Sequence, residues 1–97
     1  MEPTTNKTTP KVTLTNAYEK VICSKKIIVR LKVEDIKAPA PNRIKVEITF
    51  SDGTSKIAEA ALVSAYTNYA YYDLIAADAR EVYPRVNEIV GIRVVER

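Results

Sequence analysis

Apolar and polar side chains alternate along several segments of the chain, and this period of two predicts β-strands. The alternation is clearest over residues 26–34 and 44–51, where nearly every second side chain is apolar. Shorter alternating stretches at residues 11–15 and 86–96 predict two further strands. A strand with one buried face shows this pattern because its successive side chains point to opposite faces of the sheet.

The segments between these strands predict either loops or one additional strand. Residues 18–23 form a strand of their own or continue the first strand past a kink at Asn16. Residues 35–43 contain Pro39 and Pro41. Proline lacks the N–H group that a central strand needs, so this segment is predicted to be a loop.

The dipeptide Asp52-Gly53 separates two alternating segments and predicts a β-hairpin. Both central residues of a type I′ turn must tolerate positive φ, and Asp-Gly meets this requirement. A two-residue turn of this kind places Ile48 opposite Ile57. A register shifted by one residue would set two glutamates opposite each other, so charge favours the two-residue turn.

The period changes over residues 61–83, and the new spacing predicts one α-helix that ends before Pro84. Small and aromatic side chains recur there at intervals of four and three residues, which places them on one face of a helix. This stripe consists of Ala65, Tyr69, Tyr72, Ala76, Ala79 and Tyr83.

Together these elements predict an α+β fold: a small, mainly antiparallel sheet of four to five strands with one helix in the C-terminal half of the chain. The predicted order is β-β-β-hairpin-α-β. Residues 11–97 are expected to form a single domain, since a chain of 97 residues supplies one hydrophobic core. Residues 1–10 are polar and rich in threonine, and they are expected to form a flexible polar arm.

The predicted helix carries more apolar surface than packing on one sheet requires, because its polar residues never form a continuous strip. Either the helix is broken near Tyr72-Asp73, or a second copy of the chain or a larger assembly covers one flank. An exposed tyrosine surface with another use is the third alternative. Tyrosine suits an interface because its large ring is buried at modest entropic cost and keeps a polar end. The interface candidates are Leu62, Tyr66, Tyr69, Tyr71, Tyr72 and Ile75.

The residue types of the chain argue against catalysis. Histidine, the usual general base and zinc ligand, is absent, and Cys23 is the single cysteine. Without a paired base, we expect Cys23 to be a small buried residue rather than a nucleophile. An enzyme that holds magnesium through carboxylates is the alternative. Its candidate ligands would be Glu47, Asp52, Glu59, Asp73 and Asp78. Their spacing fits no defined ligand pattern, so we expect no enzyme, no cofactor or metal site and no small-molecule substrate.

Positive charge is concentrated in the first half of the chain. Residues 1–45 contain ten lysines and arginines against four acidic residues, whereas residues 46–97 contain five against eight. Such a basic face serves an anionic partner, head-to-tail self-association, or solubility alone. The nucleic-acid candidates are Lys25, Lys26, Arg30, Lys32, Lys37, Arg43 and Lys45. The basic strand itself has no aromatic residue that would stack on bases, which weakens this alternative.

The sequence therefore favours a binding function over catalysis. We expect a non-catalytic protein–protein interaction and assembly module, either a homo-oligomer or a small structural subunit of a larger particle such as a virion. Nucleic-acid binding through residues 25–45 is the alternative. No apolar run is long enough to span a bilayer, so we expect no membrane partner and a cytoplasmic protein, or a virion component if the source is viral. The scarcity of thermolabile side chains favours a thermophilic source.

Overall fold

The structure is a computed structural model that describes residues 11–21, 23–36 and 39–96. The arm predicted at residues 1–10 lies outside the described residues. Within them the chain forms β1 (Lys11–Val21), β2 (Lys25–Glu34), β3 (Arg43–Phe50), β4 (Ser55–Ala65), β5 (Tyr69–Leu74), α1 (Ala76–Val82), the 3-10 segment η1 (Tyr83–Glu88) and β6 (Ile89–Glu96). The expectation of a mainly antiparallel sheet with one helix in the C-terminal half is confirmed.

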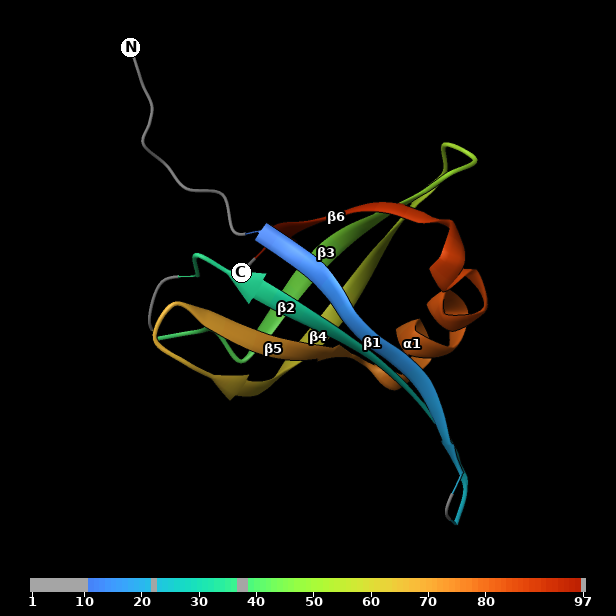
Figure 1. Cartoon of the computed structure of the whole chain (residues 1–97), viewed down its shortest axis with the longest axis horizontal. Helices are drawn as coiled ribbons and strands as arrows, with labels where there is room; N and C mark the ends of the chain where they lie inside the picture. The colour runs from blue at the N-terminus through green and yellow to red at the C-terminus, as the bar shows by residue number, and fades with distance from the viewer. Residues whose placement is uncertain (1–10, 22, 37–38, 97) are drawn as a thin grey trace.

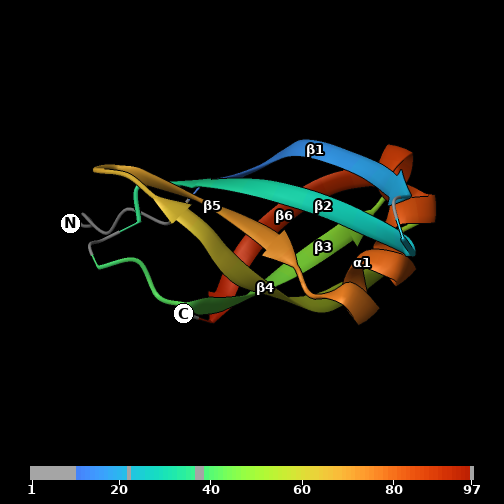
Figure 2. The ribbon, with the colours of Figure 1, turned by 90° about the horizontal axis from the view of Figure 1, so that it is seen from below.

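The strands form one closed barrel in the order β1-β2-β5-β4-β3-β6 (Figures 1 and 2). Every pairing between the described strands is antiparallel. Among the described residues, the closure between β1 and β6 consists of a single residue pair, Lys11 opposite Arg93. The predicted number of four to five strands is wrong, because part of the predicted helix forms strand and brings the barrel to six.

The apolar side chains of the alternating segments fill the interior of the barrel. The fully buried set on the two clearest strands is Val29, Leu31 and Val33 of β2 with Ile44, Val46 and Ile48 of β3. Small side chains on β4 and β5 complete the interior, namely Ala58, Ala60 and Ala70. The period-two prediction for β2 and β3 is therefore confirmed, since their buried side chains recur at every second position.

The prediction of one helix over residues 61–83 is wrong. Its first part continues β4 to Ala65, and after a tight turn the chain returns as β5. In that turn the N–H of Tyr66 donates to the carbonyl oxygen of Tyr69 at 2.8 Å. The side chains of β5 alternate, with Ala70, Tyr72 and Leu74 inward and Tyr69, Tyr71 and Asp73 outward. The segment fits both a helical and a strand period. Tyrosine favours strands, and pairing with β2 on one side and β4 on the other selects the strand.

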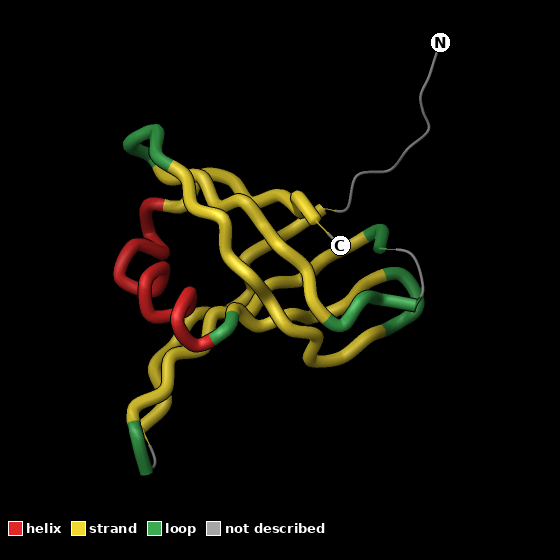
Figure 3. The backbone as a smooth tube through the Cα atoms, turned by 180° about the vertical axis from the view of Figure 1, so that it is seen from behind, coloured by secondary structure: helices red, strands yellow, loops and turns green. Residues whose placement is uncertain are grey.

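Only Ala76–Val82 of the predicted helix is α-helical, and this short helix lies with η1 at one end of the barrel (Figure 3). Ala79 and Val82 are buried against the core. The carboxylate of Asp78 accepts a hydrogen bond from the backbone N–H of Glu59 at 2.9 Å and pairs with Lys56 at 3.3 Å, which ties α1 to β4. No helix formed by the described residues has the length and apolar character needed to cross a membrane.

The hairpin predicted at Asp52-Gly53 is present between β3 and β4, but its loop has three residues instead of two. The N–H of Phe50 donates to the carbonyl oxygen of Thr54 at 2.8 Å, and Gly53 takes a φ of 91°. Ile48 consequently lies one position away from its predicted partner. The predicted register would turn a glutamate of β4 into the barrel, whereas the observed register turns alanines inward, so burial decides the register.

The last strand also differs from its prediction. β6 begins at Ile89 because the preceding residues form η1, in which Pro84 occupies the first turn. Val90 is 66% exposed and lies at a shift in the register between β3 and β6. A register shift of this kind inserts an extra residue and re-aims the side chains beside it.

β1 is one continuous strand with a register shift between Leu14 and Asn16, which resolves the choice between one strand and two. Beyond this shift β1 and β2 continue as a two-stranded ribbon that projects past the body of the barrel (Figures 1 and 3). β5 pairs with β2 only from Arg30 onward. Residues 25–29 of β2 therefore have β1 as their one strand neighbour within the part of the chain that the structure describes.

Candidate functional site

The five carboxylates considered as magnesium ligands are spread over the barrel, and each is paired with a basic side chain. The pairs are Glu47 with Arg93, Asp52 with Arg85, Glu59 with Arg43, Asp73 with Arg30 and Asp78 with Lys56. Hydrogen bonds from Thr54, together with the nearby charge of Arg85, hold the pKa of Asp52 below its usual value. Residues 11–21, 23–36 and 39–96 contain no group of three or more potential metal ligands. The carboxylates therefore act as partners in surface ion pairs.

Three tyrosines gather on the outer surface where β4 turns into β5. The rings of Tyr66 and Tyr69 stack, with centroids 4.9 Å apart and planes inclined by 21°. The ring of Tyr71 meets both edge-on, at centroid distances of 6.1 Å from Tyr66 and 5.8 Å from Tyr69. Stacked and edge-to-face pairs are the favoured arrangements of aromatic rings. We call these three residues the tyrosine face.

The tyrosine face is bordered by a lysine from the neighbouring strand. Lys32 of β2 lies directly opposite Tyr71 of β5, and its ammonium nitrogen lies 4.7 Å from the centroid of the Tyr69 ring. A cation at this position is attracted by the negative face of the ring. The same ammonium group lies 3.7 Å from the carboxylate of Glu34, which follows on the same strand. The face thus combines aromatic surface with charges of both signs.

The other three interface candidates lie elsewhere. Tyr72 points into the barrel with 0% exposure, and its hydroxyl donates to the carbonyl oxygen of Pro41 at 2.7 Å. Burial raises the pKa of Tyr72, because the charged form would lose its hydration. Leu62 packs against the core, and Ile75 lies partly buried at the junction of β5 and α1. The structure therefore brings together three of the six candidates and places Tyr72 inside.

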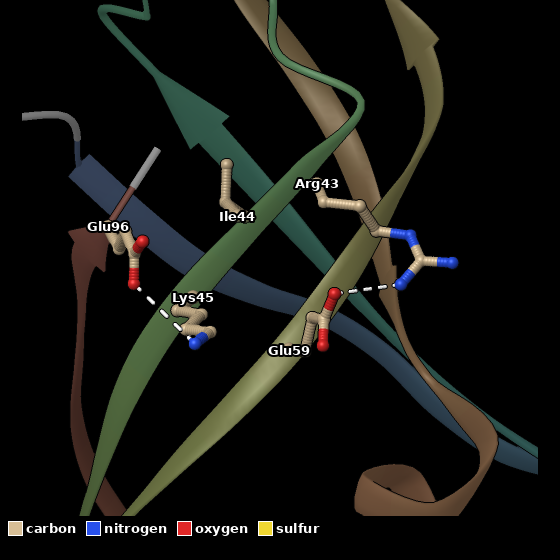
Figure 4. A pocket seen from close by; sticks show the side chains of 5 residues that line it. All are labelled: Arg43, Ile44, Lys45, Glu59 and Glu96. Carbon is tan, nitrogen blue, oxygen red and sulfur yellow. Dashed lines mark hydrogen bonds and ion pairs between the residues drawn. The ribbon is translucent and has the colours of Figure 1, made fainter.

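The basic candidates do not form one continuous stripe. Arg43 and Lys45 lie on β3, three strands around the barrel from β2. Their cationic groups pair with Glu59 and Glu96 across the outer surface of the barrel (Figure 4). On the ribbon side, Lys25 pairs with Glu19, Arg30 with Asp73 and Lys32 with Glu34. Lys37 lies outside the described residues. Most of the positive charge that would attract a phosphate backbone is thus compensated locally.

The pair between Arg30 and Asp73 marks the point where β5 leaves β2. The two residues lie directly opposite each other, and the guanidinium group donates two hydrogen bonds to the carboxylate, at 2.8 and 3.1 Å. This hydrogen bonding raises the pKa of Arg30 above its usual value. A bidentate contact of this kind fixes geometry as well as charge. The pair between Arg30 and Asp73 lies where the projecting ribbon leaves the body of the barrel.

The expectation that Cys23 is buried is wrong. Cys23 lies exposed at the connection between β1 and β2, beyond the packed part of the barrel. The expectation followed from the absence of a paired base, which argues against a nucleophile but does not determine burial. It fails here because the ribbon projects away from the core, so that Cys23 lies beyond the packed body of the barrel.

The predicted elements placed the aromatic residues on a helix apart from the basic strand, whereas in the structure they lie beside it. The separation arose because residues 69–74 were assigned to a helix. The signal that could have corrected it is the alternation of Tyr69, Tyr71 and Asp73 with Ala70, Tyr72 and Leu74. Tyrosine obscures this signal, since it is apolar enough for the core and polar enough for the surface. In the sequence, both faces of β5 are therefore partly apolar, which hides the strand alternation.

Comparison of the chain with protein-family models, with curated proteins and with solved structures finds no match. What the tyrosine face can do follows from its own chemistry. Stacked rings offer a large contact area, the phenol hydroxyls offer hydrogen bonds, and the bordering charges offer orientation. These are properties of a binding surface.

Proposed function

We propose that the chain is a non-catalytic protein–protein interaction module that self-associates through the tyrosine face. The observation that carries this proposal is the aromatic cluster itself, which lies outside a barrel whose interior is already filled. Tyr66 is 53% exposed while its ring stacks on that of Tyr69. Exposed aromatic clusters of this kind supply the energetic centre of protein interfaces. The same surface would hold the chain in a larger particle.

The charges around the tyrosine face favour a second copy of the chain as the partner. Lys32 and Glu34 lie side by side on β2, and Lys11 lies opposite Glu34 on β1. A surface that carries both signs is suited to pair with itself across a two-fold axis, because Glu34 of each copy can then face a lysine of the other. A partner whose charges all have one sign would be repelled by some of these groups.

Nucleic acid is the second candidate partner. The observation in its favour is that Tyr69 and Tyr71 adjoin Lys32, so that stacking surface lies beside the basic strand. Against it stands the pairing of Lys25, Arg30 and Lys32 with acidic neighbours, which reduces the net attraction for phosphates. Protein contact is therefore the better supported of the two.

Sedimentation equilibrium over a wide range of concentration tests the proposal. We expect the wild type to pass from a 10.8 kDa monomer to a dimer as concentration rises. The double variant Tyr66→Ser, Tyr71→Ser should dimerise at least tenfold more weakly, because each lost aromatic contact at an interface centre is worth about 1–2 kcal/mol.

The matched control is Tyr18→Ser, which removes an exposed tyrosine of β1 that is not part of the tyrosine face. It should leave the association unchanged. A wild type that stays monomeric at millimolar concentration would contradict self-association. A single-stranded oligonucleotide added to the same samples distinguishes the second candidate, because tyrosine-dependent binding of the oligonucleotide would support nucleic acid instead.

A further inference from the structure

A second surface, separate from the tyrosine face, lies at the other end of β5. β2 and β5 run side by side as far as the pair of Arg30 and Asp73, and there they diverge. β5 turns into α1, while β2 belongs to the projecting ribbon (Figure 2). The fork between them holds a groove of about 480 Å³, lined on one side by residues 25–28 and on the other by residues 73–76.

One wall of this groove is the free edge of a strand. Residues 25–28 of β2 pair with β1 on one side, and on the other side no strand pairs with them within the described part of the chain. The open edge ends there, because Val29 is fully buried. Such an edge carries backbone N–H and C=O groups that are ready to pair with another extended segment. A strand added here would occupy the position next to β2 that β5 leaves after Asp73.

Both apolar and basic side chains line the groove. Ile27, Ile28, Leu74 and Ile75 supply apolar side chains. Lys25, Lys26 and Arg80 supply three cations. The groove therefore combines apolar surface with a surplus of positive charge.

The acidic groups closest to the groove are already engaged. Asp73 is held by two hydrogen bonds from Arg30, and Lys25 pairs with Glu19 at 3.0 Å. Lys26 and Arg80 have no ion-pair partner among residues 11–21, 23–36 and 39–96. This uncompensated charge is what the groove offers to an incoming group.

We propose that the groove binds an acidic, extended polypeptide segment of another protein, which adds to β2 as a strand along residues 25–28. Backbone pairing with the strand edge supplies affinity, alternate apolar side chains enter the groove, and the acidic side chains meet Lys26 and Arg80. The paired length is about 13 Å, since a strand rises about 3.3 Å per residue.

The other occupants fit the groove less well. A second copy of the chain that paired through the same edge would bring no acidic group to Lys26 and Arg80, because residues 25–28 contain two lysines and no acidic residue. A nucleic acid would be attracted by the cations, but it has no backbone groups that match a strand edge. The lining also contains no aromatic ring on which a base would stack.

NMR titration of the whole chain tests this proposal with a defined probe. The probe is a seven-residue peptide of alternating glutamate and valine with blocked ends. We expect shifts of the amide signals confined to residues 25–28 and 73–80. The same peptide with alternate backbone nitrogens methylated should bind at least tenfold more weakly, because it cannot pair with the strand edge.

Charge variants test the contribution of the cations that line the groove. The double variant Lys26→Ala, Arg80→Ala should bind the acidic peptide about tenfold more weakly at low salt. Lys45→Ala is the matched control, because Lys45 is an exposed cation on β3 that does not line the groove. Its affinity should stay within a factor of two of the wild type.

Three results would overturn the proposal. The first is no shift at residues 25–28 with the acidic peptide at several millimolar. The second is equal binding of a lysine-valine peptide, and the third is tighter binding of an oligothymidine of equal charge. The tyrosine face is not involved in any of these measurements, so Tyr66→Ser, Tyr71→Ser should bind the peptide like the wild type. Failure of this proposal is thereby distinguishable from failure of self-association.

Discussion

The body of the barrel and the projecting β1–β2 ribbon are built from the same kind of sequence but differ in what surrounds them. Leu31, on β2 within the body, has a strand neighbour on each side and is fully buried. Val21, at the far end of β1, has one strand neighbour among the described residues and is 70% exposed. An apolar residue in a strand therefore stabilises the fold only where other elements cover it. Where nothing covers the strand, its edge and side chains become available for binding.

The largest expected difference between the two regions concerns their apolar side chains. Leu31→Ala should lower the free energy of unfolding by about 3 kcal/mol, because it removes buried methyl groups and leaves a cavity. Val21→Ala should change it by less than about 0.5 kcal/mol. Urea denaturation followed by circular dichroism measures both. Equal losses from the two variants would show that the ribbon is packed as firmly as the body.

A smaller effect is expected from the buried phenol of Tyr72. Tyr72→Phe keeps the ring but leaves the carbonyl oxygen of Pro41 without its hydrogen bond, which should cost about 1 kcal/mol. Tyr71→Phe, on the outer face, is the control and should change the free energy of unfolding by less than about 0.5 kcal/mol. Urea denaturation near pH 7 checks both values, and a larger loss from Tyr71→Phe would reverse the assignment of inner and outer faces.

The same residue predicts part of the dependence of stability on pH. The pKa of Tyr72 is raised in the folded state by burial, so the folded chain holds this proton more tightly than the unfolded chain does. Its contribution is fully present below the ordinary tyrosine pKa of about 10 and is lost as pH rises above it. Lys56, whose pKa is raised by its hydrogen bond to Glu81, acts in the same direction. Above pH 10 the free energy of unfolding of Tyr72→Phe should therefore fall less steeply with pH than that of the wild type. It should still fall, because Lys56 remains.

The smallest expected effect concerns the ion pair at the base of the ribbon. Asp73→Asn should lower the free energy of unfolding by about 0.5 kcal/mol, because a partly exposed ion pair contributes little in water. Glu19→Gln, which removes the partner of Lys25 on the ribbon, should have no measurable effect. Denaturation with and without 1 M NaCl checks the assignment, since salt should reduce the loss from Asp73→Asn. A loss that stays the same in salt would point to a hydrogen-bonding role instead.

The candidate surfaces were only partly predictable from the sequence. Tyr66, Tyr69 and Tyr71 were identified as interface candidates, but for a helix that does not exist. Their contact with Lys32 depends on the pairing of β5 with β2, which joins residues almost forty positions apart. The groove beside Lys26 and Arg80 depends on where two strands diverge, and no local pattern encodes that point.

The sequence by itself determined the strands whose alternation is free of ambiguity. Apart from Ile28, the residues of β2 and β3 have only one face that is apolar, so burial of that face leaves a single solution. The tertiary structure decided the rest. In residues 61–83 tyrosine and alanine satisfy both a helical and a strand period, and the choice was made by hydrogen bonds to β2 and by the space left inside the barrel. Local patterns set what a segment can form, and the neighbours that cover it set what it does form.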